Sequence, residues 1–199
     1  METSKSGHRR APLLQFSKVT KRFGGNVAVD RVSFDVEAGA VLALLGENGA
    51  GKSTLIKTLA GIHQRDEGEI LFEGRPLTRQ HLESGEIAFI HQDLGLVDWM
   101  TVAENMSMVM GYPRRFGVID WRAAHRLAAE ALALVGADID PRRRVSSLSR
   151  SEQSLLAIAR AVHGKARLLV LDEPTASLPA ADVEQLFQVI GDLRRQGWA

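Results

Sequence analysis

The chain has 199 residues, of which 45% are hydrophobic and 25% are charged, with a formal net charge of +1 and no cysteine. These values are typical of a globular chain of about one domain. They exclude disulfides, a membrane span of roughly 20 apolar residues, and a strong overall field for nucleic acid or membranes. The lack of cysteine agrees with a cytoplasmic protein. Residues 1–12 are polar and basic without an apolar stretch, so we expect a disordered tail and not a secretory signal.

The first predicted elements are two antiparallel strands. Leu13 to Thr20 and Val27 to Val36 alternate apolar and polar residues, with a turn from Phe23 to Asn26 between them. This arrangement leaves the Phe23 ring exposed. Two interpretations remain open for that ring, since it can stack on a base or simply pack against its neighbours.

The next segment, Gly46 to Thr54, reads GENGAGKST and fits the phosphate-loop pattern G-x-x-x-x-G-K-[ST]. The apolar run 40–45 before it predicts a buried strand, and residues 52–60 after it predict a helix that ends before Gly61. Glycines let the backbone fold tightly with its N–H groups inward, and the helix N-terminus attracts anions. We therefore expect a nucleoside triphosphate, with Lys52 on its β- and γ-phosphates and Ser53 on Mg²⁺.

Two further short strands are predicted at 69–74 and at Ile87 to Ile90. The second delivers Gln92 at its carboxyl end, where ligands bind in open α/β sheets. Gln92 is placed to contact the γ-phosphate and metal, or is an ordinary polar residue at a strand end. His91 and His63 are more readily explained as solvated or hydrogen-bonded histidines than as ligands.

A helical insert is predicted from about residue 94 to 163. Asp120 can cap a helix that runs to Val135 and is followed by Gly136, and Ser149 to Val162 has the apolar spacing of a second helix. Four methionines lie between residues 100 and 110. They form core, or an adaptable surface for a partner.

Arg167 to Leu171 predicts a buried strand that ends in Asp172 and Glu173. Adjacent carboxylates at such a position are unfavourable without a cation, so Asp172 is expected on the metal and Glu173 as the base for an attacking water. The alternative is a purely structural pair. A last helix follows, with an apolar face formed by Val183, Leu186, Phe187, Ile190 and Leu193.

In this order the motifs resemble the ATPase subunits of ATP-binding-cassette transporters, over about residues 13–199. They are GENGAGKST, FIHQD around Gln92, the segment Ser147 to Gln153 in place of the LSGGQ signature, and LLVLDEPTASL. The segments QDLGLVDWMTVAENM and GVIDWRAAHRLAAEALALVGADIDPRRRV are similar to the first cassette of tandem ATPases for bacterial monosaccharide uptake (ribose, xylose and galactose types).

The resemblance implies an α/β fold: a phosphate-loop core sheet with an antiparallel β subdomain and a helical subdomain. It implies an ATPase that uses ATP and Mg²⁺, with Glu173, Lys52 and Gln92 catalytic and Ser53, Gln92 and Asp172 at the metal. By position, nucleotide contacts fall on Phe23, Ala28, Gly46, Asn48, Gly49, Ala50, Gly51, Lys52, Ser53 and Thr54. The signature residues Ser149, Arg150, Ser151 and Glu152 would contact the nucleotide of a second, head-to-tail cassette, expected in the same full-length chain.

The same resemblance implies sugar import through a membrane permease that binds the helical subdomain, at the cytoplasmic face of the inner membrane, without nucleic acid. The sugar itself is not indicated. Three departures stand out: Arg150 and Ser151 replace the signature glycines with Glu152 at the glutamine position, Pro179 replaces a common aspartate, and the switch histidine is expected beyond Ala199. We therefore expect a first cassette cut within its domain. The alternatives are a cassette that works without transport and a regulatory cassette that binds ATP with little hydrolysis.

Overall fold

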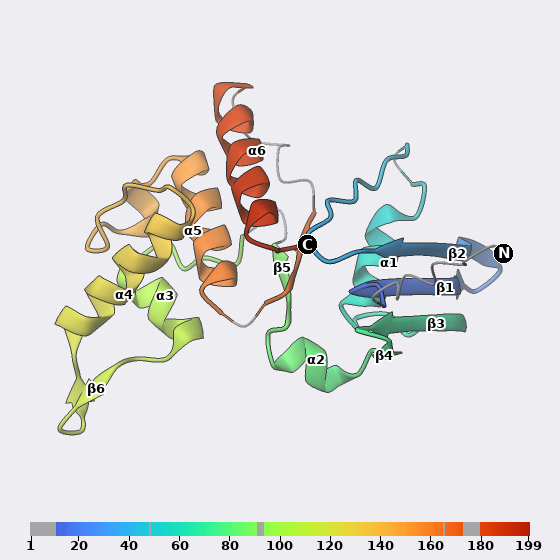
Figure 1. Ribbon diagram of the computed structural model, residues 1–199, viewed down its shortest axis with the longest axis horizontal. Coiled ribbons are helices and arrows are strands. Elements are labelled where there is room, and N and C mark those ends of the chain that lie inside the picture. Colours follow the sequence, from blue (N-terminus) through green and yellow to red (C-terminus); the bar gives the residue numbers. More distant parts are fainter. Residues whose placement is uncertain (1–10, 48, 91–93, 165, 173–179) are drawn as a thin grey trace, which may run out of the picture. The chain divides into compact units, whose positions relative to one another are not determined.

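The computed structural model describes residues 11–47, 49–90, 94–164, 166–172 and 180–199 (Figure 1). They divide into two compact units, one that ends at Thr78 and a second from Arg79 to Trp198. Each unit has its own set of buried apolar side chains. The predicted limits of the tail and of the helical subdomain stay predictions.

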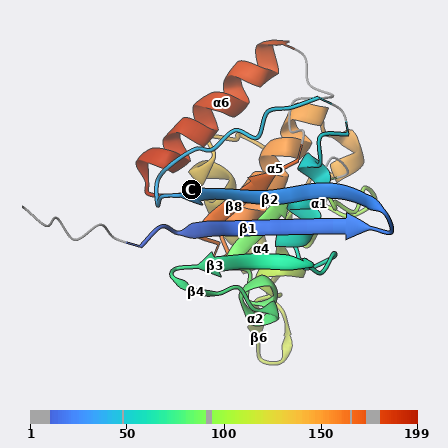
Figure 2. The ribbon, with the colours of Figure 1, turned by 90° about the vertical axis from the view of Figure 1, so that its right-hand side faces the viewer.

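The first unit is built on an antiparallel sheet with the order β2-β1-β3-β4 (Figure 2). Its strands are β1 (Leu14–Phe23), β2 (Asn26–Val36), β3 (Glu67–Phe72) and β4 (Arg75–Pro76). The predicted β1–β2 pair is confirmed, and β1 continues to Phe23, which lies opposite Asn26 in the register. Gly24 supplies the positive φ of 57° that the connecting turn requires.

One face of this sheet and the helix α1 (Lys52–Leu59) provide the core of the first unit. Buried side chains include Leu14, Phe16, Val19, Ile70, Phe72, Leu55, Ile56 and Leu59. Fully burying an apolar side chain of this size stabilises the fold by about 1.5–3 kcal/mol. Thr20 is buried among them, and its hydroxyl accepts a hydrogen bond from the Arg31 N–H at 3.0 Å, which satisfies the polar group.

The predicted strand at residues 40–45 is wrong. Among the described residues this run forms no strand, and Val41, Leu42, Leu44 and Leu45 are 39–90% exposed. A strand of this kind exists only when neighbouring backbones take up its N–H and C=O groups, and no described strand pairs with it. The run has the apolar composition of a buried strand, but none of the described strands pairs with it.

The second unit contains a pair of parallel strands, β5 (Ile87–Ile90) and β8 (Leu168–Leu171), in register from Ile87 with Leu168 to Ile90 with Leu171. Both strands were predicted from sequence. The short helix α2 (Arg79–Glu83) precedes β5. The Asp172 N–H continues the ladder by donating to the Ile90 carbonyl at 3.0 Å, so the ends of the two strands lie together.

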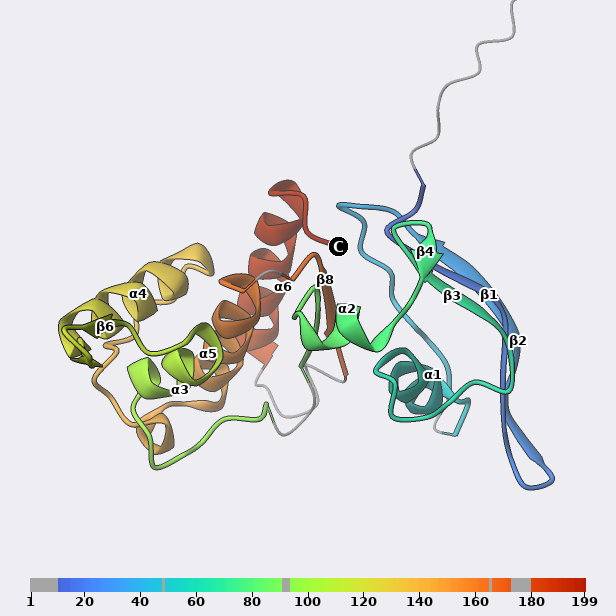
Figure 3. The ribbon, with the colours of Figure 1, turned by 90° about the horizontal axis from the view of Figure 1, so that it is seen from below.

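Four longer helices pack in the second unit (Figure 3). They are α3 (Val102–Met110), α4 (Trp121–Leu134), α5 (Arg150–Val162) and α6 (Ala180–Arg195), with a 3₁₀ turn at Val145–Ser147. The two predicted helices of the insert are confirmed: Asp120 caps α4 through its carboxylate, and Ser149 caps α5. The hairpin of β6 (Arg114–Arg115) and β7 (Val118–Ile119) between α3 and α4 was not predicted.

The apolar faces of this unit differ from the predicted ones in two respects. On α6, Phe187 is 59% exposed, whereas Val189 is buried in its place, because the helix meets the core through Leu186, Val189 and Leu193. The methionine stripe is split: Met106 is 1% exposed and belongs to the core, but Met108 is 53% exposed. Helical periodicity alone does not fix which face of a helix turns inward.

Candidate functional site

The phosphate loop has the backbone of an anion cradle. Gly49 and Gly51 have φ values of 89° and 88°, which residues with a side chain rarely adopt. Gly51 is the N-cap of α1, and no described side chain caps this helix. The first N–H groups of α1 are therefore left for a ligand, and the helix dipole favours a negatively charged one.

The Lys52 ammonium group lies over this loop. It donates to the Gly46 carbonyl at 2.7 Å and to the Glu47 carbonyl at 3.0 Å, both within the loop. The Ala50 N–H also donates to the Glu47 carbonyl at 3.1 Å, and this hydrogen bond closes a turn within the loop. The ammonium group thus has two neutral carbonyl oxygens as partners. A phosphate oxygen can take their place, and its negative charge makes the hydrogen bond stronger.

Gly51 also packs against β2. A Cβ built on Gly51 would lie 2.2 Å from the Ala28 carbonyl oxygen, so only glycine permits this approach. The structure thereby brings together two predicted nucleotide residues, Ala28 and Gly51, from segments that are far apart in the sequence. Because Ala28 lies in β2, between the paired residues Val27 and Val29, the contact ties the β1–β2 hairpin to the loop.

Phe23 occupies the end of the same hairpin. Phe23 is 45% exposed, His63 meets its ring edge-on with ring centroids 5.1 Å apart, and the Lys21 ammonium lies 5.3 Å from the Phe23 centroid. Such a ring has neighbours and still offers apolar surface. Both interpretations of Phe23, as a base platform and as a packing residue, therefore remain predictions. His63, expected to be an unremarkable histidine, supports the ring.

The remaining predicted loop residues lie as follows. Ser53 is exposed in the first turn of α1, and the half-buried Thr54 accepts at its carbonyl a hydrogen bond from the Thr58 hydroxyl at 2.7 Å. Asp172 is half-buried at the end of β8. Asn48, Gln92 and Glu173 lie outside the described residues, as does Pro179. No cluster of three acidic, histidine or cysteine residues suited to a metal occurs in the part of the chain that the structure describes.

The signature segment forms the capped start of α5. The Ser149 hydroxyl accepts from the Glu152 N–H at 3.2 Å, and the Glu152 carboxylate accepts from the Ser149 N–H at 2.7 Å. This reciprocal arrangement is a capping box. It was not predicted, although the spacing Ser-x-x-Glu signals it in the sequence, as Thr101-x-x-Glu104 does at the start of α3.

An arginine from outside the helix reinforces this cap. Arg143 donates to the Glu152 carboxylate at 2.7 Å and to the Ser147 carbonyl at 2.6 Å. Burial acts to raise the pKa of Glu152, but the hydrogen bonds from Ser149 and Arg143 outweigh it and hold that pKa below its ordinary value. The helix N-terminus at the signature thus holds a carboxylate that belongs to the chain itself.

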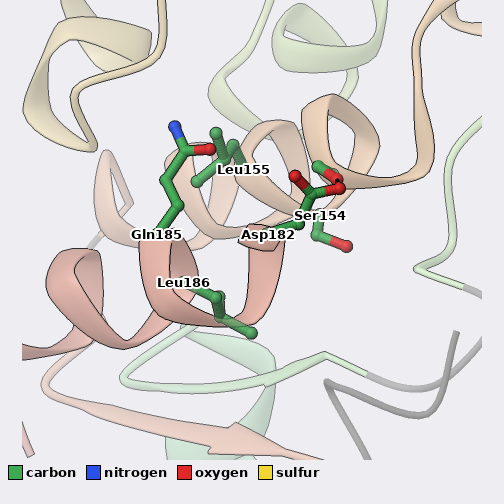
Figure 4. A pocket seen from close by; sticks show the side chains of 6 residues that line it. Ser154, Leu155, Asp182, Gln185 and Leu186 are labelled. Carbon is green, nitrogen blue, oxygen red and sulfur yellow. Dashed lines mark hydrogen bonds between the residues drawn. The ribbon is translucent and has the colours of Figure 1, made fainter. Parts of the chain in front are cut away.

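Ser151, at a position where the resembling family has glycine, joins α5 to α6. Its hydroxyl hydrogen-bonds the Asp182 carboxylate in the first turn of α6. Figure 4 shows Asp182 and Gln185 of α6 beside Ser154 and Leu155 of α5, around a small pocket that Ser151 also lines. Ser151 therefore forms, through its hydroxyl, a contact with Asp182 that a glycine at this position could not form.

Arg160 is not among the predicted site residues, yet it contacts a loop next to them. From α5 it donates to the carbonyls of Leu94 and Gly95, at 2.9 and 2.8 Å, in the loop that follows the predicted Gln92 site. Both loop residues have positive φ, of 56° and 55°. Burial lowers the pKa of Arg160. No local pattern signals such a contact, because its partners are 65 and 66 positions away.

Comparison with known proteins places these features in a family. The family model described as ABC transporter matches residues 29–176. The chain is 47% identical to a ribose import ATP-binding protein of Corynebacterium glutamicum, over 96% of the chain and 37% of that protein. It is 44% identical to a putative ribose/galactose/methyl galactoside import ATP-binding protein of Burkholderia lata, over 94% of the chain and 37% of that protein. The chain thus spans little more than a third of these relatives.

Solved structures agree on the fold. An ATP-binding cassette of an ABC transporter in its ADP conformation matches with a TM-score of 0.78 and 26% identity, over 94% of this chain and 78% of the other. A protein from Clostridium perfringens that is part of an ABC transporter complex matches with a TM-score of 0.80 and 24% identity, over 94% of this chain and 75% of the other. The α/β phosphate-loop fold class is therefore confirmed. The described residues contain no helix long and apolar enough to cross a membrane. The chain belongs to the ABC transporter family.

Proposed function

We propose that this chain is an ATP-binding and ATP-hydrolysing cassette that powers monosaccharide import. The observation that carries the proposal is the phosphate loop: an uncapped helix start, two glycines with positive φ, and Lys52 held over the loop by carbonyls. The identity to ribose and ribose/galactose import ATP-binding proteins supports the sugar class. The particular sugar is left to the permease and its binding protein.

We assign a different part of the nucleotide, metal and water to each group of site residues. The N–H groups at the start of α1 bind the phosphates, and Lys52 exchanges its two carbonyl partners for β- and γ-phosphate oxygens. Ser53, Gln92 and Asp172 are proposed to hold Mg²⁺, which neutralises charge on the phosphates when bound. Glu173 accepts a proton from the attacking water. Phe23 and Ala28 receive the base.

The partners follow from the same proposal. A second cassette packs head to tail, so that Ser149 to Glu152 reach the nucleotide of the partner and the signature of the partner reaches this one. A membrane permease contacts the helices of the second unit. The working location is the cytoplasmic face of the inner membrane.

One experiment tests nucleotide binding by this chain. Phe23→Ala should weaken ATP by about 1–3 kcal/mol if the ring stacks on adenine, and should leave tripolyphosphate unaffected because that ligand has no base. Calorimetry measures both ligands. Phe187→Ala, which removes an exposed ring on α6, is the matched control. Equal losses for both ligands would make Phe23 a packing residue, and no binding of either ligand would refute the proposal.

A second experiment tests hydrolysis and transport. In the full-length protein with its permease, Glu173→Gln should lower the single-turnover rate of ATP hydrolysis by about 10²–10⁴-fold, the usual contribution of a positioned base. Steady-state ATPase with and without the permease then separates the alternatives. Stimulation by the permease supports an importer. ATP binding without turnover in either condition would indicate a regulatory cassette, and turnover indifferent to the permease would indicate a cassette that works without transport.

A further inference from the structure

The hairpin β6–β7 exposes an aromatic ring at a position that disfavours it. Arg114 pairs with Ile119 and Arg115 with Val118, so Phe116 and Gly117 form a two-residue turn. Both have positive φ, of 52° and 84°, as in the type I′ turns that prefer Asn-Gly. A phenylalanine in this conformation is strained. Phe116 is nevertheless 93% exposed, so burial in the core does not explain its presence.

The base of the hairpin is anchored, which leaves the turn as a defined tip. The Asp120 N–H closes the base by donating to the Pro113 carbonyl at 2.8 Å, and Asp120 caps α4 with its carboxylate. Tyr112 and Trp121 meet edge-on at the same place, with ring centroids 6.1 Å apart. Figure 1 shows the hairpin extending beyond α3 and α4 of the second unit.

The tip is basic as well as aromatic. Between Tyr112 and Arg122 the chain carries three arginines and one carboxylate, that of Asp120. The Arg115 guanidinium lies 5.4 Å from the centroid of the Phe116 ring. Within the part of the chain that the structure describes, neither Arg114 nor Arg115 forms an ion pair. Although the net charge of the whole chain is only +1, the hairpin tip is locally positive.

We propose that the β6–β7 hairpin binds an anionic lipid surface, with Arg114 and Arg115 on headgroup phosphates and Phe116 in the interfacial layer. Exposed aromatic residues flanked by arginines suit the boundary between headgroups and acyl chains. A stable protein interface involves about 20–30 residues on each partner, whereas this hairpin spans only residues 114–119. The proposal rests on the proposed function in one respect, that an importer cassette works beside a membrane.

The test is co-sedimentation of the chain with vesicles of phosphatidylglycerol and, separately, of phosphatidylcholine. We expect binding to the anionic vesicles that weakens as salt is raised, and little binding to the zwitterionic ones. Arg114→Gln with Arg115→Gln should lower partitioning by about five-fold for each arginine. Arg142→Gln with Arg144→Gln, which changes the net charge equally at two other exposed arginines, should lower it much less.

A second pair of variants isolates the ring. Phe116→Asn creates the Asn-Gly sequence that type I′ turns favour, so the hairpin is retained while the aromatic side chain is lost. We expect about ten-fold weaker partitioning. Phe187→Asn, at an exposed ring on α6, should have no effect. Circular dichroism and ATP titration of every variant keep misfolding, and any failure of the proposed nucleotide function, separate from the lipid result.

Three outcomes would overturn the proposal. They are no binding to phosphatidylglycerol vesicles, equal binding to both vesicle types, and binding that the hairpin variants leave unchanged. If vesicles are not bound but the hairpin variants lower permease-stimulated ATPase, the tip contacts a protein and the lipid assignment is wrong.

Discussion

The N-termini of helices α1 and α5 differ in how their first N–H groups are satisfied. The N-cap of α1 is Gly51, with no described side chain on the first N–H groups of the helix, whereas the N-cap of α5 is Ser149, which forms a reciprocal capping box. The second start is further closed by Arg143 on the Glu152 carboxylate. Every α-helix has a positive dipole end at its N-terminus and first N–H groups without a partner inside the helix, so α1 and α5 begin alike in this respect. The difference is that one leaves those donors for a ligand and the other satisfies them with its own chain.

This contrast separates a binding site from a structural cap. An uncapped start gives up the stability that a cap would add, about 0.5–2 kcal/mol, in exchange for donors that a phosphate can use. The signature start keeps that stability. If Ser149 to Glu152 contact a partner's nucleotide as proposed, that nucleotide meets a helix whose N-terminal charge is already partly balanced by Glu152. Perturbing each start should therefore have different consequences.

The largest effect is expected at Gly51. Gly51→Ala places a Cβ 2.2 Å from the Ala28 carbonyl oxygen in addition to the strain of a left-handed residue, about 1–2 kcal/mol. The loop must move away from β2, and ATP affinity measured by calorimetry should fall by more than about a hundred-fold, or roughly 3 kcal/mol. Gly49→Ala is the control, since it has the same φ strain and no atom within 4 Å. Equal losses in both variants would show that the Ala28 contact is unimportant.

Lys52 comes next. Lys52→Ala should weaken ATP by about 1.5–3 kcal/mol, the scale of a hydrogen bond to a charged group. Lys57→Ala, at an exposed lysine in the last turn of the same helix, should change the affinity little. Calorimetric titration of both variants gives the comparison. Unchanged affinity in Lys52→Ala would remove this ammonium group from the site.

The capped start should respond in stability and not in nucleotide affinity. Ser149→Ala removes the hydroxyl that accepts from the Glu152 N–H and should lower the free energy of unfolding by about 0.5–2 kcal/mol in urea titrations. The isolated chain should keep the ATP affinity of the parent, because the proposed pair places Ser149 on the nucleotide of the partner. Ser17→Ala, at an exposed position on β1, serves as the neutral control. A loss of ATP affinity with full stability would reverse the contrast drawn between the two helices.

The smallest effect concerns pH. The hydrogen bonds from the backbone N–H and the hydroxyl of Thr101 lower the pKa of Glu104 from its ordinary 4.5. The pKa of Glu152 is lowered as well. A carboxyl group whose pKa is lower in the folded state stabilises the fold. This stabilisation is complete at a pH above the unfolded-state pKa, and it is lost as the pH falls through the folded-state pKa. Glu104→Gln and Glu152→Gln should each flatten the acid side of a stability–pH profile. Profiles identical to the parent would show that these caps contribute no pH dependence.

Several elements around the candidate site could be predicted because their signals are local, whereas the roles of the site residues stay predictions. The phosphate loop, the Asp120 cap and the strands at Ile87 and Leu168 follow from glycine spacing, capping chemistry and short apolar runs. The capping box at Ser149 was equally readable but was missed. The β6–β7 hairpin escaped prediction because its turn holds Phe116 where Asn is usual, so only Gly117 signalled it.

The sequence by itself determined what depends on neighbours within a few positions: the anion-binding loop, the helix starts and the apolar content of each element. Only the tertiary structure decided what depends on distant partners. Residues 40–45 have the composition of a strand, yet no described strand pairs with them, and Phe187 is exposed although it fits the helical stripe. Ser151 meets Asp182 across 31 positions. The physical reason is that hydrogen-bond pairing and burial are properties of two surfaces in contact, and a sequence pattern describes only one of them.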